Sequence, residues 1–338
     1  MDIARRSIRT LELCGLELFV PFVRLALGDE RRAQLGVLAR TLGAPCLALL
    51  LFGGAWSLAA ARIETSIGRL PGPAQVGAAF ESLVAEHRAE RARVAEFEAR
   101  MELRRAEALA AGKPWQDRRY VGAPTFLDQI VTSLETVFTG FVLASLLAVP
   151  LGILCGTSAT VYAALNPVIQ VLRPVSPLAW LPIVMIVVSA MSSANEPLLP
   201  RSFISSAVTV ALCSLWPTLV NTALGVSSVE RDHWNVARVL RLGFWTRVRK
   251  IVLPSALPWI WSGLRLSLGV GWMVLIAAEM LAQNPGLGKF VWDMFQSGSS
   301  ESLARIMVAV LTIGSIGFGL DRVMTTVQRA LSHDLRPA

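Results

Sequence analysis

The residues best placed to do chemistry in this 338-residue chain are Arg173, Arg265 and Glu279, charges that stand inside long uncharged stretches. A charge inside a membrane costs about 2.5–3.5 kcal/mol on insertion scales, so each needs a partner or a role. A guanidinium presents a planar fork of donors that matches a small oxyanion, which makes Arg265 and Arg173 candidates for an anion path. The alternative is an arginine that reaches the membrane surface or pairs within the protein. For Glu279 we expect a structural or gating role.

Three prolines, Pro174, Pro177 and Pro182, fall within one apolar stretch and predict an interrupted helix. Proline removes a backbone donor and bends a helix, and Ser176 between them can satisfy a freed carbonyl. Transporters often line a cavity with such broken helices at mid-membrane depth. Ser176 and Trp180 are therefore further candidates for the path, and simple packing is the alternative.

Residues 234–242 indicate a site of a different kind, because they follow an apolar stretch and precede the helix breaker Pro254. The segment predicts a short helix with apolar residues on one side and arginines around them. Such a helix suits a groove on another protein, and an anionic lipid surface is the alternative. The candidate docking residues are Asn235, Val236, Ala237, Arg238, Val239, Leu240, Arg241 and Leu242.

Catalytic and metal chemistry is not indicated by the sequence. His87, His233 and His333 are the only histidines, all outside the apolar stretches, and neither an HExxH nor a GxSxG motif occurs. The four cysteines lie far apart without CxxC spacing, which argues against a disulfide or a metal site. The chain also lacks a GxxxxGK(S/T) phosphate loop, so the sequence does not indicate a phosphate-loop nucleotide site on this chain. We expect a non-catalytic chain without a cofactor of its own.

The composition predicts an all-α integral membrane protein. Apolar residues make up 54% of the chain, charged residues make up 17%, and the mean hydropathy is +0.54. These values lie outside the usual range of soluble domains. Backbone groups in hydrocarbon must pair within their own segment, so uncharged stretches of about 20 residues predict spanning helices. The six expected spans are 41–61, 126–156, 164–190, 202–229, 259–281 and 302–320.

The distribution of basic residues predicts the side of the membrane that each loop faces. Residues 1–40 hold seven Lys/Arg, residues 227–256 hold six, and the tail after residue 320 holds three. Under the positive-inside rule these segments, and with them both termini, are cytoplasmic. Residues 62–128 carry 11 basic and 10 acidic residues, but long loops translocate regardless of charge, so we place them outside. Membrane topology therefore explains the net charge of +8 without nucleic-acid binding.

Two segments lie outside this six-span core. Residues 11–27 form an apolar run interrupted by charges, which predicts an interfacial helix along the cytoplasmic surface. Residues 81–107 are rich in Ala, Glu and Arg and predict one long helix or a helical hairpin, either a solvated insertion or a contact for an external partner.

The expected organisation is an N-terminal segment at 1–40, the first span at 41–61, an outer loop with the helical insertion at 62–125, a core at 126–320 with the docking helix at about 228–243, and a cytoplasmic tail at 321–338.

The docking segment resembles the cytoplasmic motif of binding-protein-dependent ABC importer permeases, in which EAA, three residues and G precede an LP pair at a fixed interval. Counting back from that pair at 253–254, residues 235–237 (NVA) fall on the EAA positions and Arg241 falls on the glycine. Three of these four positions differ from the general motif, and in this difference the chain is similar to the nitrate, cyanate and bicarbonate branch. Further similar stretches are NPVIQVLRPVSPLAWLPI (166–183), LWPTLVNTALGV (215–226) and GLGKFVWDMFQ (286–296).

The resemblance covers nearly all of residues 42–331 apart from 81–119, and it implies a permease subunit of a type I importer in the bacterial inner membrane. Such a subunit pairs with a second copy, with two cytoplasmic ATPase subunits that bind ATP and Mg, and with an external solute-binding protein. The implied substrate is a small inorganic anion, nitrate or nitrite first, with bicarbonate or cyanate next. Taurine and sulfonate permeases share PLAWLP and GLR and are one alternative. A stand-alone secondary transporter is another, but it predicts intramembrane carboxylates and an internal repeat.

Overall fold

The computed structural model describes residues 43–333 except 66–67, 113, 117, 119 and 192–198, together with residues 36, 37 and 40. The interfacial helix expected at 11–27 lies outside the described residues. The described chain is helical apart from one short antiparallel pair, β1 (Glu64–Thr65) and β2 (Gly68–Arg69).

Five helices are long and apolar enough to cross a membrane, and a bent pair counts as a sixth crossing if it is taken as one span. The predicted all-α membrane fold of about six spans is therefore confirmed. The helices are α4 (Ala44–Arg62), α5 (Pro73–Ala110), α6 (Phe126–Thr157), α7 (Ala159–Leu172), α8 (Pro177–Met191), α9 (Arg201–Ser227), α10 (Arg231–Val239), α11 (Phe244–Arg247), the π-helix η3 (Val248–Val252), α12 (Leu253–Ala282), α13 (Leu287–Ser297) and α14 (Ser300–His333).

Two predicted elements differ from the structure. The stretch 164–190 is not one helix, because α7 and α8 meet at a bend of 102°. The last span does not stop at residue 320 either: α14 continues to His333, so residues 321–333 are helical and do not form a separate tail. The apolar stretch ends at Asp321, but a change from apolar to polar side chains does not by itself end a helix.

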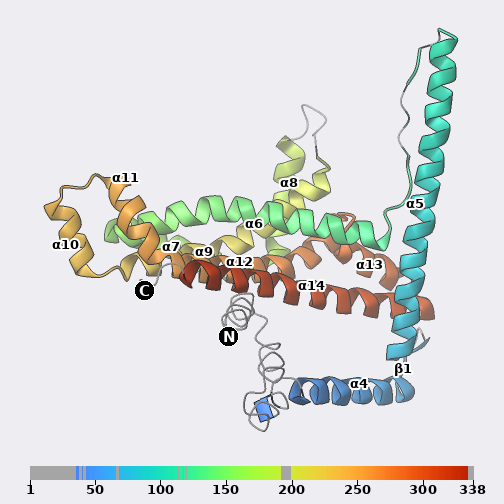
Figure 1. The fold of residues 1–338 in the computed structure, drawn as a ribbon, viewed down its shortest axis with the longest axis horizontal. Helices are drawn as coiled ribbons and strands as arrows, with labels where there is room; N and C mark the ends of the chain where they lie inside the picture. Colours follow the sequence, from blue (N-terminus) through green and yellow to red (C-terminus); the bar gives the residue numbers. More distant parts are fainter. Residues whose placement is uncertain are drawn as a thin grey trace, which may run out of the picture.

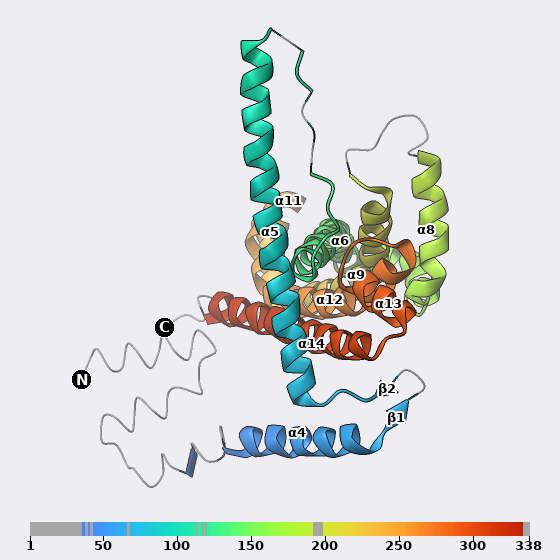
Figure 2. The ribbon, with the colours of Figure 1, turned by 90° about the vertical axis from the view of Figure 1, so that its right-hand side faces the viewer.

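Helices α6, α9 and α12 run alongside one another at the centre of the bundle (Figures 1 and 2). Small residues set the contact between α6 and α9. A Cβ on Gly152 would lie 2.6 Å from the Thr222 Cβ, and one on Gly156 would lie 2.5 Å from the Val226 Cβ. Glycine at these positions lets the two backbones approach closely, as in other membrane helix pairs.

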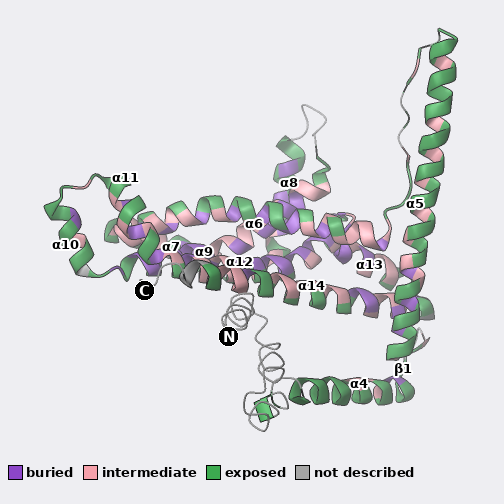
Figure 3. Ribbon diagram, in the orientation of Figure 1, coloured by how far each residue is buried: buried purple, intermediate pink, exposed green. Residues whose placement is uncertain are grey.

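Helix α4 stands apart from the bundle and approaches the rest of the described chain near its C-terminal end, beside the start of α5 (Figure 1). There the Trp56 Nε1 donates a hydrogen bond to the Pro71 carbonyl oxygen at 3.1 Å. The remaining surface of α4 is apolar and exposed along its length (Figure 3), with Leu50 73% exposed. An apolar surface of this extent requires lipid or another chain to cover it.

Helix α5 is a single helix of 38 residues and not a helical hairpin. It crosses the ends of the bundle near α13 and α14, and its C-terminal half extends beyond them (Figure 2). The chain returns along this half, where the rings of Phe97 and Tyr120 meet edge to face with centroids 5.4 Å apart. The Tyr120 hydroxyl donates a hydrogen bond to the Glu90 carboxylate at 2.6 Å, which raises the pKa of that phenol.

The N-terminal half of α5 is fastened to the bundle by ion pairs. The Arg305 Nη2 on α14 lies 2.5 Å from the Glu86 Oε1. Arg91 pairs with Asp128 in the first turn of α6. The insertion is therefore tied to the ends of α6 and α14 that the distribution of basic residues predicts to lie outside.

Candidate functional site

The bend between α7 and α8 is built from prolines and a capping serine. Pro174 lies two residues beyond the end of α7, directly after the C-cap Arg173, and lacks the N–H that would continue the helix. Pro177 is the first residue of α8, where a missing N–H is tolerated. The Ser176 Oγ accepts a hydrogen bond from the Leu178 N–H at 3.3 Å, as an N-cap residue does. Ser176 therefore serves a freed N–H, and the predicted role of satisfying a freed carbonyl is corrected. Pro182 lies inside α8 and does not interrupt it.

Three of the four candidate path residues lie at this bend. Arg173 and Ser176 are exposed, and Trp180 is partly buried. The Trp180 Nε1 is itself buried and has no acceptor among the described residues. The N-terminus of α8 adds a partial positive charge from its helix dipole. The bend thus combines a cation, a hydroxyl, an unpaired N–H donor and a helix N-terminus.

Arg265, the fourth candidate, lies elsewhere, between α12 and α14. Its Nε and Nη2 donate to the two carboxylate oxygens of Asp321 at 2.6 and 2.9 Å. The planar fork that suits an oxyanion is therefore occupied by a carboxylate of the same chain. This geometry matches the alternative in which the arginine pairs within the protein. A small cavity of about 200 Å³ beside the pair is otherwise lined mainly by apolar residues and glycine.

Glu279 is fully buried near the end of α12, where it joins three helices. Its carboxylate accepts hydrogen bonds from the Ser133 Oγ on α6 and from the Gly288 N–H of α13, both at 2.9 Å. The Ser133 Oγ in turn accepts from the Leu287 N–H at 2.8 Å. These contacts give Glu279 the structural role expected for it, because they hold the turn into α13 against α6.

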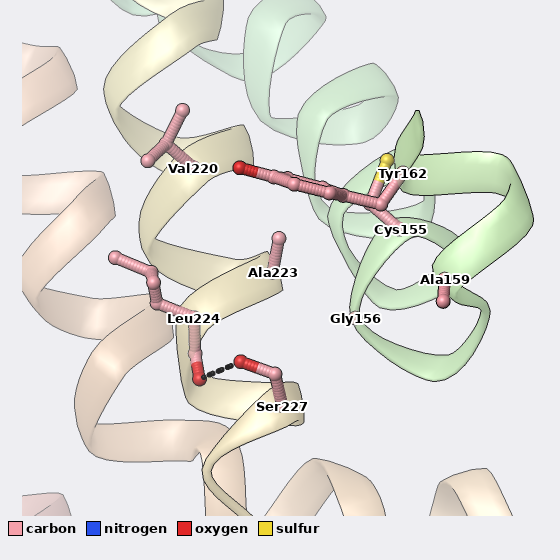
Figure 4. Close-up of a pocket in the computed structure, with 8 residues that line it drawn as sticks. All are labelled: Cys155, Gly156, Ala159, Tyr162, Val220, Ala223, Leu224 and Ser227. Carbon is pink, nitrogen blue, oxygen red and sulfur yellow. Dashed lines mark hydrogen bonds between the residues drawn. The ribbon is translucent and has the colours of Figure 1, made fainter. Parts of the chain in front are cut away.

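A cavity of about 370 Å³ lies between α7 and the ends of α6 and α9. Tyr162 extends from α7 toward Val220 on α9, with Cys155 beside its ring (Figure 4). The Ser227 Oγ donates to the Leu224 carbonyl oxygen at 2.9 Å (Figure 4). No basic side chain is among the residues that line this cavity, so it offers no counter-charge to an anion.

Helix α10 lies beyond the ends of the spanning helices and leads through α11 and η3 into α12 (Figure 1). Its apolar residues divide between two sides. Ala237 is 2% exposed and faces inward, whereas Val236, Val239 and Leu240 are 53%, 81% and 63% exposed. The predicted short helix with an apolar ridge is therefore present, and the ridge is open to a partner.

The end of α10 explains why the motif that this segment resembles has glycine at the position of Arg241. The Leu242 N–H bonds to the Ala237 carbonyl and the Arg241 N–H bonds to the Arg238 carbonyl, both at 3.0 Å, which together form a Schellman motif. Arg241 has φ of 50°, the left-handed conformation that this motif requires. Glycine adopts it freely, whereas a residue with a Cβ pays about 1–2 kcal/mol.

Trp234 connects α10 to the bundle, and the sequence analysis did not single it out. Its ring packs against the buried cluster around Val226 and Val252, and the Arg247 guanidinium lies 5.6 Å from the ring centroid. This cation–π contact joins α10 to α11, immediately before η3. A π-helix inside an α-helical segment often marks a functional site. The alternation of apolar and basic residues predicts the exposed ridge of α10. It does not predict that Trp234 turns inward toward the bundle.

Asp321 was also missed, because the sequence analysis ended the last span at residue 320. Its pairing with Arg265 joins residues 56 positions apart, so it depends on how α12 packs against α14. Of the predicted sites, the docking candidates remain adjacent in α10 and the turn that follows it. Ala237 is an exception to the predicted docking role, because it is 2% exposed and faces the bundle. The path candidates divide into the bend at 173–180 and the α12–α14 contact.

Spanning helices, a broken helix and an amphipathic helix beyond their ends define a multi-pass membrane transport subunit. Residues 148–335, more than half of the chain, match the family described as "Binding-protein-dependent transport system inner membrane component". The chain belongs to this family, the non-catalytic permease subunits of ABC importers.

Two curated relatives share 37% identity with the chain. One is the nitrate import permease protein NrtB of Synechococcus elongatus, aligned over 60% of this chain and 69% of that protein. The other is the bicarbonate transport system permease protein CmpB of the same species, aligned over 61% of this chain and 70% of that protein. A solved structure of the MetNI methionine ABC transporter, in inward-facing conformations, is similar in fold. The superposition covers 61% of this chain and 95% of the transporter chain, with a TM-score of 0.52. The sequence identity is 14%, so this similarity supports the fold alone.

Proposed function

We propose that this permease forms the path for a small inorganic anion, nitrate or nitrite first and bicarbonate or cyanate next. The observation that carries the proposal is the equal identity, 37%, to a nitrate permease and a bicarbonate permease over about the same length. The anions in the names of these two relatives, nitrate and bicarbonate, are both small planar oxyanions. The proposal therefore takes the substrate class that the two relatives share.

The path that we propose passes the bend between α7 and α8. Arg173 supplies a positive charge, Ser176 a hydroxyl, and Trp180 an N–H whose hydrogen bond is otherwise unmade. Discontinuous helices in transporters point their N-termini at anionic groups, and the N-terminus of α8 is of this kind. We assign Arg265 a supporting role at the contact between α12 and α14, because Asp321 holds its guanidinium there.

We further propose that a second copy of the chain completes the path and that α10 of each copy docks on a cytoplasmic ATPase subunit. The exposed ridge of Val236, Val239 and Leu240 supports this assignment, since apolar residues spaced i, i+3 and i+4 suit a groove. ATP and Mg are then bound by the ATPases, and an external binding protein delivers the anion. Both termini are cytoplasmic in this proposal, on the side where basic residues concentrate.

The test is transport in vesicles that contain the permease, its ATPase subunits and ATP inside, with its binding protein and isotopically labelled anion outside. We expect ATP-dependent uptake of nitrate that unlabelled nitrite or cyanate reduces. Replacing Trp180 with Phe removes the N–H donor and part of the ring but keeps an aromatic side chain, and it should lower uptake severalfold with the complex intact. Uptake of taurine or a sulfonate, with none of nitrate or bicarbonate, would contradict the proposed substrate class.

The docking role of α10 is tested by Val239→Asp. Val239 is 81% exposed, so a carboxylate there leaves the fold unchanged but places a charge in an apolar contact. We expect the variant to insert in the membrane normally and to lose most ATPase binding. Leu103→Asp on α5, at a side chain 67% exposed, is the matched control and should bind the ATPase normally. Normal ATPase binding by Val239→Asp would exclude the docking role.

A further inference from the structure

The residue that terminates α10 carries a side chain that its backbone disfavours. Arg241 has φ of 50°, and among the described residues only Gln283 shares a positive φ without being glycine. The Schellman hydrogen bonds at this position need only a backbone in the left-handed conformation, which glycine provides without strain. An arginine here gains a favourable interaction with the helix dipole of about 0.3–1 kcal/mol, which is less than the backbone cost of about 1–2 kcal/mol. A further role of its side chain is therefore needed to account for its presence.

Among the described residues that side chain has no hydrogen-bond or ion-pair partner, whereas Arg238 has one. The Arg238 Nη2 donates to the Asn235 Oδ1 at 2.8 Å, which holds that guanidinium along the helix. The Arg241 guanidinium is exposed and makes no hydrogen bond or ion pair with any described residue. It directly follows Leu240, the last residue of the exposed apolar ridge. A free cation therefore stands at the edge of the surface proposed to enter the ATPase groove.

The departures from the general motif change the charge of this surface in one direction. Asn235 replaces an acidic residue and Arg241 replaces a neutral one, so both make the docking face more positive. A partner groove suited to this face needs negative charge at its rim.

We propose that Arg241 determines which ATPase this permease accepts, by pairing with a carboxylate on the rim of the ATPase groove. The inference rests on the docking role proposed for α10 and names the chemistry of its partner. The guanidinium fork binds a carboxylate through two parallel hydrogen bonds, so it adds geometry as well as charge. An ATPase with a neutral or basic rim loses this contact and is rejected. In Figure 1, α10 is the outermost element at its end of the bundle, which suits a partner beyond the membrane better than a lipid surface.

The test uses the full-length permease in nanodiscs and the separately purified ATPase subunit of its own importer. Arg241→Gly removes the charge and relieves the backbone, so the thermal midpoint should stay equal or rise. ATPase affinity should nevertheless fall about tenfold at low salt, and the difference from wild type should vanish near 0.5 M NaCl as the pair is screened. Arg241→Lys keeps the charge and should retain most of the salt-dependent affinity.

Gln283→Gly is the matched control, because it relieves the same left-handed strain at the far end of α12. It should leave ATPase affinity unchanged. Wild-type affinity of Arg241→Gly at every salt concentration would overturn the proposal, as would an equal loss in Gln283→Gly. If Arg241→Gly instead weakens only binding to vesicles containing phosphatidylglycerol, the guanidinium serves lipid and the proposal fails. If Val239→Asp still binds the ATPase, the docking role itself fails, which is a separate result.

Discussion

Single residues fix the turn between α12 and α13 through very close contacts. A Cβ on Gly288 would lie 2.1 Å from the Ile276 carbonyl oxygen, and one on Gly286 would lie 2.1 Å from the Glu279 Oε1. Neither position tolerates a side chain unless backbone or a buried carboxylate moves. The same carboxylate receives the Gly288 N–H, so glycine at 288 permits both the approach and the hydrogen bond.

Gly288→Ala is therefore expected to destabilise the permease by about 1–3 kcal/mol, the usual cost of forcing extra atoms into a packed site. Thermal unfolding in detergent, followed by circular dichroism, measures the change. Gly269→Ala on α12 is the control, because a Cβ there meets nothing within 4 Å. Equal midpoints for the two variants would show that the turn relaxes more easily than its contacts indicate.

Among the elements, the two halves of α5 differ in what they contact. The first half is held by Arg305 and Asp128 of the bundle, whereas the second half contacts mainly its own returning segment. Stability of the bundle should therefore depend on the first half alone. The projecting half is then available for a role outside the spanning helices.

Replacing residues 94–117 with a short Gly/Ser link tests this division. The link leaves Glu90 and Tyr120 in place, and their hydrogen bond shows that the two chain segments already lie close there. We expect the thermal midpoint to stay within about 2 °C of wild type. Arg305→Ala, which removes the contact with the first half, should lower the midpoint more than the excision does. The reverse order would assign the stabilising contacts to the projecting half.

For the whole molecule, α5 and α10 lie at opposite ends of the spanning helices (Figure 1), so they face opposite sides of the membrane if the spanning helices cross it. Basic residues concentrate around α10, which supports the proposal that this end is cytoplasmic. Helix α5 then lies outside, although its own segment is slightly basic. The exposed apolar surface of α4 needs lipid or another chain to cover it.

In a background without native cysteines, Leu109→Cys should react with a membrane-impermeant maleimide added to intact spheroplasts. Val239→Cys should react only after permeabilisation. Both side chains are exposed, at 65% and 81%, so burial does not separate them. Labelling of Val239→Cys in intact spheroplasts would reverse the proposed orientation.

The sequence by itself determined the membrane class, most of the spans and the place of the short helix that we propose docks, because runs of apolar residues and a fixed motif interval are local properties. It also located the bend at Pro174 and Pro177, since proline acts on its own helix. Tertiary structure alone decided that Asp321 occupies the fork of Arg265 and that Trp234 faces inward. It also decided that the Trp180 N–H finds no acceptor in the part of the chain that the structure describes. These facts depend on which helices meet and at what angle. Contacts between residues that are distant in the chain produce no periodic pattern in the sequence, so the sequence does not predict them.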